Sequence, residues 1–263
     1  MSITRPARTL IMGILNVTPD SFSDGGRYQS VDAALTRAAE LVAAGADILD
    51  VGGQSTRPGH TPIAWEEEWA RLEPVLAPLA ASVSVPISVD TYHPQVAARA
   101  VAAGASIIND VSGSLQNGMP ALAAALGATL VMTNAAETVG DAIAAAAHYF
   151  DAALALADQS GLPRDRIILD VGIGFGKTRA DDRRLIEEIG TLVRAYAPLP
   201  ILVGASRKRV TDPDGLLPPD QRVAATIALH SIAQRGGAKI LRVHDVAEAV
   251  SAARAIDAIH HQA

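Results

Sequence analysis

Short apolar runs alternate with longer Ala- and Leu-rich segments of helical pattern along the whole chain. The apolar runs, each of strand length, cover residues 10–17, 47–52, 86–91, 106–111, 129–134, 167–171, 200–206 and 239–246. The helical segments that follow them cover residues 31–44, 65–80, 94–103, 120–126, 142–160, 181–195, 220–234 and 247–259. Eight strands, each followed by a helix, predict an α/β fold, a (β/α)8 TIM barrel, whose strands are apolar throughout because both of their faces are buried.

The same pattern predicts a single domain over residues 1–263, with no linker between the runs. A doubly wound open sheet is the alternative fold, and the regular alternation over the full length favours the closed barrel. Four helical segments end in a Gly-Ala pair just before the next run, at Gly45, Gly104, Gly127 and Gly237. Glycine permits the left-handed residue that stops a helix, so these pairs mark the turns into the strands.

One stretch, LDVGIGFGKT over residues 169–178, ends an apolar run in a carboxylate and continues with three glycines at alternate positions. Its GKT ending resembles a P-loop, but that motif needs a glycine where this chain has Val171, so the match fails. The glycine spacing also differs from that of the GxGxxG dinucleotide motif. We therefore interpret the stretch as a strand that delivers Asp170 to the mouth of a pocket, followed by backbone that can approach a ligand closely.

Polar residues gather where the predicted strands end, which is where barrel enzymes place their active sites. These residues are Asn16, Asp50, Asp90, Asn109, Asp110, Asp170, Ser206, Arg207, Lys208, Arg242 and His244. The opposite ends of the strands carry mainly Gly, Ala and Pro. A turn or a cap explains a single Asp equally well, but several polar residues at one rim predict an active site.

The alternation of a strand decides which of these side chains share a face. Asn109 and Asp110 cannot both face the pocket, whereas Arg242 and His244, two residues apart, can. Two carboxylates and an amide suit a flat ligand edge rich in N–H and NH2 donors, and they are Asp90, Asp170 and Asn109. Cationic side chains suit a phosphate or a carboxylate, and they are Arg57, Lys208, Arg242 and His244. A ligand with a heterocycle at one end and phosphates at the other satisfies both sets, and Asn16 is a candidate to hold Mg2+ against the phosphates.

Composition limits the partners. The formal net charge of -6 argues against a nucleic-acid binder, and the chain has no cysteine for a disulfide or a thiolate metal site. No apolar run approaches the roughly 18 residues of a membrane span, and the N-terminus lacks the pattern of a signal peptide. We therefore expect a cytoplasmic protein that acts on small molecules, with no membrane partner. A Ser-His-Asp triad from Ser206, His244 and an Asp is an alternative chemistry, but the GxSxG motif of a nucleophile elbow is missing.

Seven segments, in their order and spacing, resemble those of dihydropteroate synthases, and the resemblance spans nearly the whole chain. The segments are GILNVTPDSFSDGG at 13–26, STRPG at 55–59, SVDT at 88–91, INDV at 108–111, GIGFGK at 172–177, SRK at 206–208 and RVHDV at 242–246. The resemblance implies condensation of a pyrophosphorylated hydroxymethyl-dihydropterin with para-aminobenzoate, which releases pyrophosphate and forms 7,8-dihydropteroate for folate synthesis. It also implies Mg2+ as a cofactor and a homodimer.

The resemblance assigns roles to individual residues. The pterin edge is expected to bind Asp90, Asn109 and Asp170, with Met132 and Lys208 around the ring. The pyrophosphate is expected to bind Asn16, Arg57, Arg242 and His244, with Asn16 as the metal ligand. The loops that shape the aminobenzoate site contain Asp20, Thr56, Gly174, Phe175 and Ser206. Of all these residues, we expect Asp20, Arg57 and Lys208 to be catalytic.

The chain departs from the family pattern at four places. It has Gln54 where Glu is usual, Val171 where Pro is usual, Thr133 after Met132 where His is usual, and RVTD at 209–212 where a Phe-Ile-Gly type segment is common. Two alternatives therefore stay open, a pterin-binding paralogue without turnover and a methyltransferase that acts on methyltetrahydrofolate. Related barrels bind that pterin with similar Asp and Asn positions, but the SRK segment and the first-loop motif favour the synthase.

Overall fold

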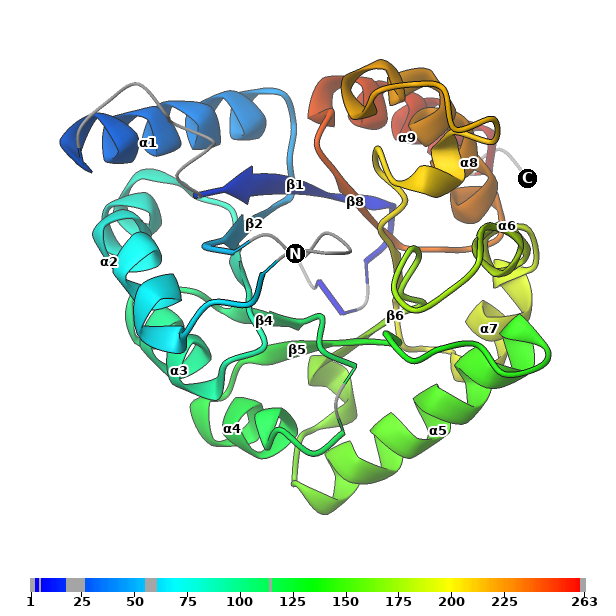
Figure 1. Cartoon of the computed structure of the whole chain (residues 1–263), viewed down its shortest axis with the longest axis horizontal. Helices are drawn as coiled ribbons and strands as arrows, with labels where there is room; N and C mark the ends of the chain where they lie inside the picture. Colours follow the sequence, from blue (N-terminus) through cyan, green and yellow to red (C-terminus); the bar gives the residue numbers. More distant parts are fainter. Residues whose placement is uncertain (1–2, 5, 18–26, 55–60, 114, 261–263) are drawn as a thin grey trace.

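The computed structural model describes residues 3–4, 6–17, 27–54, 61–113 and 115–260. Eight parallel strands close into a barrel in sequence order, and the helices form a ring around it (Figure 1). The strands are β1 Leu10–Asn16, β2 Ile48–Gly52, β3 Ile87–Asp90, β4 Ile107–Asp110, β5 Thr129–Thr133, β6 Ile167–Asp170, β7 Ile201–Val203 and β8 Ile240–Val243. The α-helices are α1 Arg27–Ala43, α2 Trp65–Ser82, α3 Pro94–Ala102, α4 Met119–Leu126, α5 Ala142–Gln159, α6 Arg179–Glu187, α7 Ile189–Tyr196, α8 Val223–Arg235 and α9 Val246–His260. The predicted (β/α)8 barrel is confirmed.

Apolar side chains pack on both sides of the wall of strands. The lumen is filled by a buried layer that consists of Leu10, Met12, Ile48, Ile107, Val131, Ile168, Leu202 and Ile240. Ile3 packs against this layer. A larger cluster lies between the strands and the helices, and it includes Leu49, Val89 and Leu169. Because neighbouring strand residues divide between the two clusters, the strands are buried on both faces, as their apolar runs predicted.

The inward positions of several strands become polar one step beyond the apolar layer. Two residues after a member of that layer come Asp50, Asn109, Thr133, Asp170 and Arg242. Side chains two residues apart in a strand point to the same face, so these polar groups face the same lumen, nearer the carboxyl ends of the strands. The strand pattern thus builds a hydrophobic floor with a polar mouth above it.

Three predicted elements differ clearly from the observed ones. The strand expected over 239–246 ends at Val243, and Val246 already belongs to α9. The helix expected over 181–195 is divided into α6 and α7 at Glu188, whose φ of -100° and ψ of 15° are not helical. Gly190, which follows, favours helix poorly. The strand expected over 200–206 ends at Val203, because the N–H of Ala205 donates to Nε2 of His230 at 3.0 Å instead of continuing the ladder. The predicted helix stops are confirmed, since all four Gly-Ala glycines have positive φ.

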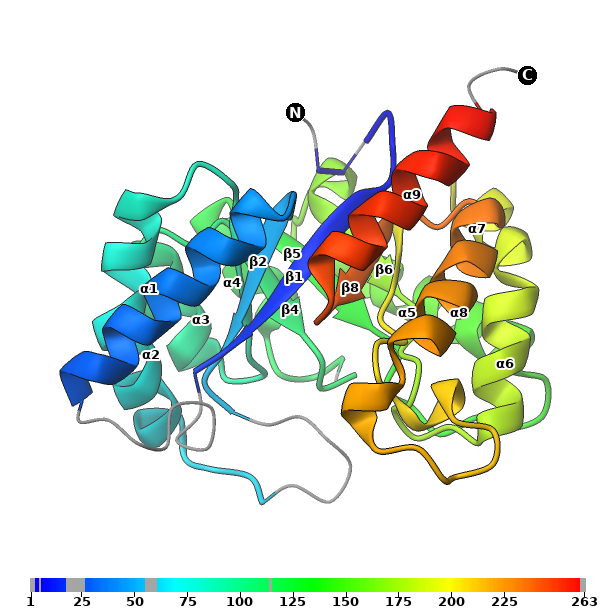
Figure 2. The same ribbon diagram turned by 90° about the horizontal axis from the view of Figure 1, so that it is seen from above.

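The two ends of the barrel differ in what they carry. Figure 2 shows the start of β1 and the end of α9 at one end, and the carboxyl ends of the strands at the other. Within the described ranges, no helix combines the length and the apolar character that crossing a membrane requires.

Candidate active site

The carboxyl ends of the strands bring three predicted residues to one mouth of the barrel. Asp90 and Asn109 are paired directly in the register of β3 and β4, and Asp170 is the last residue of β6. All three are buried, with 4%, 1% and 6% of their surface exposed. Asn109 turns inward and donates to Asp50, whereas Asp110 accepts hydrogen bonds from the loop that follows β4. The predicted opposition of Asn109 and Asp110 is therefore confirmed.

Oδ1 of Asp90 and Oδ1 of Asn109 are buried acceptors at this mouth that have no partner within the described part of the chain. Oδ1 of Asp50, beneath them, is a third such atom. A buried polar atom without a hydrogen bond costs about 1–3 kcal/mol, so two such acceptors from neighbouring strands fit a ligand edge that brings N–H donors. Burial raises the pKa of Asp90 to about 7, although the positive charge of Arg242 opposes the rise.

The carboxylate of Asp170 is held by the start of the loop that follows it. Its Oδ1 accepts the N–H of Gly172 at 2.9 Å, and its Oδ2 lies 3.4 Å from the hydroxyl of Thr133. Burial raises the pKa of Asp170, and Lys208 opposes this shift. Gly172 has a φ of 69°, and a Cβ there would lie 1.9 Å from the carbonyl oxygen of Asn134. Only glycine therefore fits at the point where this loop leaves the strand.

Arg242 joins two acidic residues across the mouth. Its Nε donates to Asp50 at 2.6 Å, and another guanidinium nitrogen donates to Asp90 at 2.5 Å. Burial disfavours the charge of Arg242, but Asp50 and Asp90 outweigh it and raise the pKa of the guanidinium. Asp50 was recognised from the sequence as a polar residue at a strand end, but no role followed from that position. The structure shows that it contacts Arg242 and Asn109 together.

Lys208 is brought to the loop that follows β6. Its Nζ donates to the carbonyl oxygen of Ile173 at 2.6 Å and lies 4.4 Å from the centre of the Phe175 ring. A Cβ on Gly174 would lie 3.1 Å from Cδ of Lys208. Burial lowers the pKa of Lys208 to about 8, and Asp170 opposes the shift. The structure thus unites Lys208 with Gly174 and Phe175, which were predicted to line the same site.

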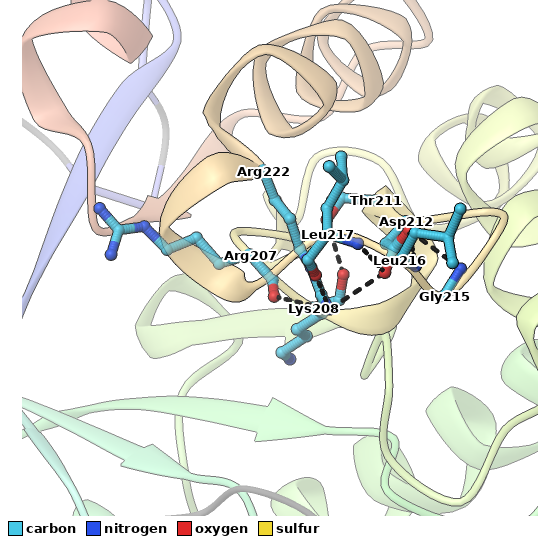
Figure 3. Close-up of polar contacts among 8 residues, drawn as sticks. All are labelled: Arg207, Lys208, Thr211, Asp212, Gly215, Leu216, Leu217 and Arg222. Atoms are coloured by element: carbon cyan, nitrogen blue, oxygen red, sulfur yellow. Dashed lines mark hydrogen bonds and ion pairs between the residues drawn. The ribbon is translucent and has the colours of Figure 1, made fainter.

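The segment that carries Lys208 is fixed by a buried ion pair (Figure 3). Asp212, of which 1% is exposed, accepts hydrogen bonds from Arg222 and from the backbone N–H groups of residues 215, 216 and 217. Arg222 also donates to the carbonyl oxygen of Arg207 at 3.3 Å. The hydroxyl of Thr211 donates to the carbonyl oxygen of Lys208 at 2.7 Å. Arg207 has a φ of 58°, which is unfavourable for a residue with a side chain. These bonds hold the turn in that conformation.

Ser206 and His244 meet at the ends of β7 and β8. The hydroxyl of Ser206 lies 3.0 Å from Nδ1 of His244 and accepts the backbone N–H of His244 at 3.1 Å. The adjacent carboxylate, Asp245, forms an ion pair with Arg207. Because that carboxylate is engaged by a guanidinium, the pair resembles a polar contact for an anion more than a nucleophile with its base.

Lys177 also lies at this mouth. In the sequence it drew notice only as part of the GKT ending that failed to match a P-loop. Its side chain is buried, and Nζ donates to the carbonyl oxygens of Asn134 at 2.5 Å and of Phe175 at 3.0 Å. Burial lowers its pKa, and Asp170 opposes the shift. The ammonium group therefore ties the end of β5 to the loop after β6. A lysine between a glycine and a helix cap gives no signal of this role in the sequence.

The remaining predicted residues divide into two groups. Asp20, Thr56 and Arg57 lie outside the described residues. Asn16 is the last residue of β1 and is partly exposed at the mouth. Met132 is buried and belongs to the cluster between strands and helices, so its contact with a ring stays a prediction.

A metal site made of protein groups alone is not present among the residues that the structure describes, where no three His, Cys, Asp or Glu side chains come together. Asn16 could contribute an amide oxygen, and Mg2+ commonly takes one or two protein ligands and completes its shell with phosphate oxygens and water. The single amide therefore fits a metal that arrives with a phosphorylated substrate.

Comparisons with known proteins agree on one family. The profile of the pterin-binding enzymes matches residues 12–244. The dihydropteroate synthase of Bacillus subtilis is 39% identical, and the match covers 97% of this chain and 92% of the relative. The dihydropteroate synthase of Escherichia coli is 38% identical over 94% of this chain and 90% of its own.

Solved structures give the same result. A dihydropteroate synthase from Clostridium difficile, crystallised in the presence of pteroic acid, superposes with a TM-score of 0.93 at 38% identity and covers 99% of both chains. A dihydropteroate synthase from Xanthomonas albilineans, in complex with 7,8-dihydropteroate, superposes with a TM-score of 0.87 at 38% identity. That match covers 97% of this chain and 94% of the other.

Proposed function

This chain belongs to the dihydropteroate synthase family of pterin-binding enzymes, and we infer from that membership that it is a transferase of folate biosynthesis. The reaction condenses 6-hydroxymethyl-7,8-dihydropterin pyrophosphate with para-aminobenzoate and yields 7,8-dihydropteroate and pyrophosphate. Atoms balance because the C–O bond to pyrophosphate breaks, a C–N bond to the arylamine forms, and the amine loses one proton.

One observation about the mouth carries the assignment of the pterin site. The unpartnered oxygens of Asp90 and Asn109 form an acceptor edge, and the carboxylate of Asp170 adds a third buried acceptor group. The aminopyrimidinone edge of a pterin carries N–H and NH2 donors, so it can satisfy these groups. We place the pterin there, with Lys208 and Met132 beside the ring.

The cationic side chains at the mouth suit the leaving group. Breaking the C–O bond leaves positive charge on the pterin methylene and negative charge on pyrophosphate, so catalysis is mainly electrostatic. The carboxylates favour the cationic pterin, while Arg242, Lys208 and His244 favour pyrophosphate. We assign Arg57 to the same anion, as the family resemblance implies.

The second substrate is assigned to the loops around Phe175. Lys208 packs over the face of Phe175, next to Gly174, so this wall adjoins the proposed pterin site. Ser206 lies in the loop after β7, two residues before Lys208. We assign para-aminobenzoate to this wall and, as the family resemblance implies, Asp20 and Thr56 to the same site, where exclusion of water would protect the cationic pterin. Asp20 is our candidate for a catalytic residue on the first loop.

Two features of the family are proposed for this chain as well. When bound, Mg2+ would neutralise charge on the pyrophosphate, and Asn16 would hold it together with the phosphate oxygens. A homodimer is the proposed assembly. The cytoplasmic location stays a prediction.

The proposed activity is tested by giving the purified protein the pterin pyrophosphate, para-aminobenzoate and Mg2+. We expect release of pyrophosphate and formation of 7,8-dihydropteroate, both dependent on the arylamine. Pterin binding by calorimetry without any release above a protein-free control would support the paralogue instead. Methyl transfer from methyltetrahydrofolate to a corrinoid protein would support the methyltransferase, which the family membership does not favour.

A further inference from the structure

Asp50 lies beneath the mouth and contacts both halves of the proposed site. Its side chain is fully buried, and its Oδ2 accepts from Nδ2 of Asn109 at 3.1 Å and from Nε of Arg242 at 2.6 Å. Asn109 belongs to the proposed pterin edge and Arg242 to the proposed pyrophosphate end. Asp50 itself has no exposed surface, and these two contacts of its Oδ2 link it to the groups that face the ligand, while its Oδ1 has no partner within the described residues.

The contact with Asn109 decides which end of an amide faces the ligand. An asparagine amide has one acceptor oxygen and one donor NH2, whereas an ionised carboxylate can only accept. Asp50 therefore selects the NH2 of Asn109, and it leaves Oδ1 of Asn109 as an unpartnered acceptor. The reversed amide would place two oxygens against each other in a buried site, which is unfavourable.

The neighbouring residues make this arrangement self-consistent. Arg242 supplies the opposite charge that a buried carboxylate such as Asp50 requires, and it reaches on to Asp90. It engages Oδ2 of Asp90, so Oδ1 of Asp90 stays unpartnered as well. Asp90 and Asn109 are register neighbours in β3 and β4. Two acceptors thus come from adjacent strands, and both orientations depend on one buried ion-pair network.

We propose that Asp50 is a positioning residue that sets the ligand specificity of the pterin edge by fixing the amide orientation of Asn109. The inference rests on the proposed function, because it takes the pterin to be the ligand of that edge. Asp50 makes no contact with substrate in this role; it determines that the edge accepts hydrogen bonds rather than donating one.

The substitution Asp50→Asn tests the orientation directly. The new amide has one oxygen and one NH2. With the oxygen kept for Nε of Arg242, its NH2 can donate to Oδ1 of Asn109, which allows the amide of Asn109 to reverse and to present its own NH2 to the ligand. Calorimetry would compare 6-hydroxymethylpterin with 6-hydroxymethyllumazine, in which an oxygen replaces the 2-amino group. We expect Asp50→Asn to weaken pterin binding by about tenfold or more and to reduce the preference for pterin over lumazine, because a donor then faces a donor.

Asp47→Asn is the matched control. Asp47 immediately precedes β2 and is also buried. It pairs with Arg8 and accepts the N–H of Ile11, at the end of the barrel away from the mouth. This control should keep both the affinity for 6-hydroxymethylpterin and the preference over lumazine. A general loss of packing in the barrel would instead change the affinities for the two ligands together and leave their ratio unchanged.

An exchange of the two residues supplies a second test that does not depend on the single variant being stable. In the double variant Asp50→Asn, Asn109→Asp, the amide at position 50 donates to the carboxylate at 109, whose other oxygen still faces the ligand as an acceptor. We expect the double variant to bind 6-hydroxymethylpterin at least about tenfold more tightly than Asn109→Asp alone, because that single variant opposes two carboxylates.

Two results would overturn the proposal, an unchanged pterin-to-lumazine ratio in Asp50→Asn, or a double variant that binds no more tightly than Asn109→Asp. Failure of the wild-type protein to bind 6-hydroxymethylpterin at all would count against the proposed function and against this inference with it. Wild-type binding with an unaffected ratio in Asp50→Asn would remove the inference alone.

Discussion

At the scale of single residues, the site depends on which buried groups keep their charge. Burial lowers the pKa of Lys208 to about 8, so its ammonium form is present below that pH and is lost as the pH rises through it. A neutral amine no longer attracts pyrophosphate. We expect kcat/KM for the pterin pyrophosphate to fall by about tenfold between pH 7 and pH 9, which is the change in protonated fraction for a pKa near 8.

The variant Lys208→Arg provides the comparison, since a guanidinium keeps its charge across this range. Its activity at pH 7 can be lower because the geometry differs, so the measured quantity is the ratio between the two pH values within each protein. We expect that ratio to stay near one in Lys208→Arg. The same alkaline loss in both proteins would assign the titration to a group other than Lys208.

The face to which a strand side chain points was predictable wherever the alternation of the strand determines it. The opposition of Asn109 and Asp110 followed from alternation alone, and the structure confirms it. The role of Asp50 did not follow, because the sequence cannot show which cation or amide a buried carboxylate meets across a barrel. Gln54 illustrates the same limit, since its amide both accepts from Ile63 N and donates to the hydroxyl of Tyr92.

At the scale of elements, the loop after β7 determines where Ser206 and Lys208 lie, and a buried ion pair holds that loop (Figure 3). Asp212 accepts three backbone N–H groups as well as Arg222. We expect Asp212→Asn to lower the free energy of unfolding by about 1–3 kcal/mol, because it leaves the partly buried guanidinium of Arg222 without its counter-charge and replaces one acceptor oxygen by an NH2 group. Urea denaturation measures this loss.

The same change should also affect turnover, because Arg222 contacts the carbonyl oxygen of Arg207, beside Lys208. We expect kcat/KM to fall by about tenfold, at a temperature where the variant is still folded, as the loop loses its fixed position. Asp214→Asn is the control, since Asp214 lies two residues away and is exposed. If Asp212→Asn has the same free energy of unfolding and the same kcat/KM as Asp214→Asn, the ion pair does not position this loop.

Strands were more predictable than the loops that carry the chemistry. An apolar run of four to eight residues reports burial on both faces, and all eight runs contain a strand. The end of β7 was predicted three residues too late, because hydrophobicity does not reveal that His230 takes the N–H of Ala205. The structure also has short 3-10 helices at Arg209–Thr211 and Pro219–Gln221, next to the ion pair of Asp212 with Arg222. These features depend on local contacts that no hydrophobic periodicity encodes.

At the scale of the whole molecule, closure of the barrel creates the site. Arg242 and Asp50 are 192 residues apart in sequence, yet they meet because β8 pairs with β1 and β1 pairs with β2. Counting strand–helix repeats predicted the closure, and closure predicted that strand ends share one mouth. Within that mouth, Arg242 from β8 therefore meets Asp50 from β2 and Asp90 from β3.

Folding of the barrel should not depend on a metal ion, and this gives a prediction for the whole protein. The described residues form a continuous core without any acid or histidine cluster that could hold a metal, so removing Mg2+ with EDTA should leave the melting temperature of the ligand-free protein unchanged within about 1 °C. Turnover should be lost, because the negative charge of pyrophosphate is no longer neutralised. Calorimetry should show that Mg2+ strengthens binding of the pterin pyrophosphate but not of 6-hydroxymethylpterin, which has no phosphate. Asn16→Ala should raise the Mg2+ concentration needed for half-maximal turnover several-fold, as expected for a lost ligand. An EDTA-induced fall in melting temperature would instead place a structural metal within the protein itself.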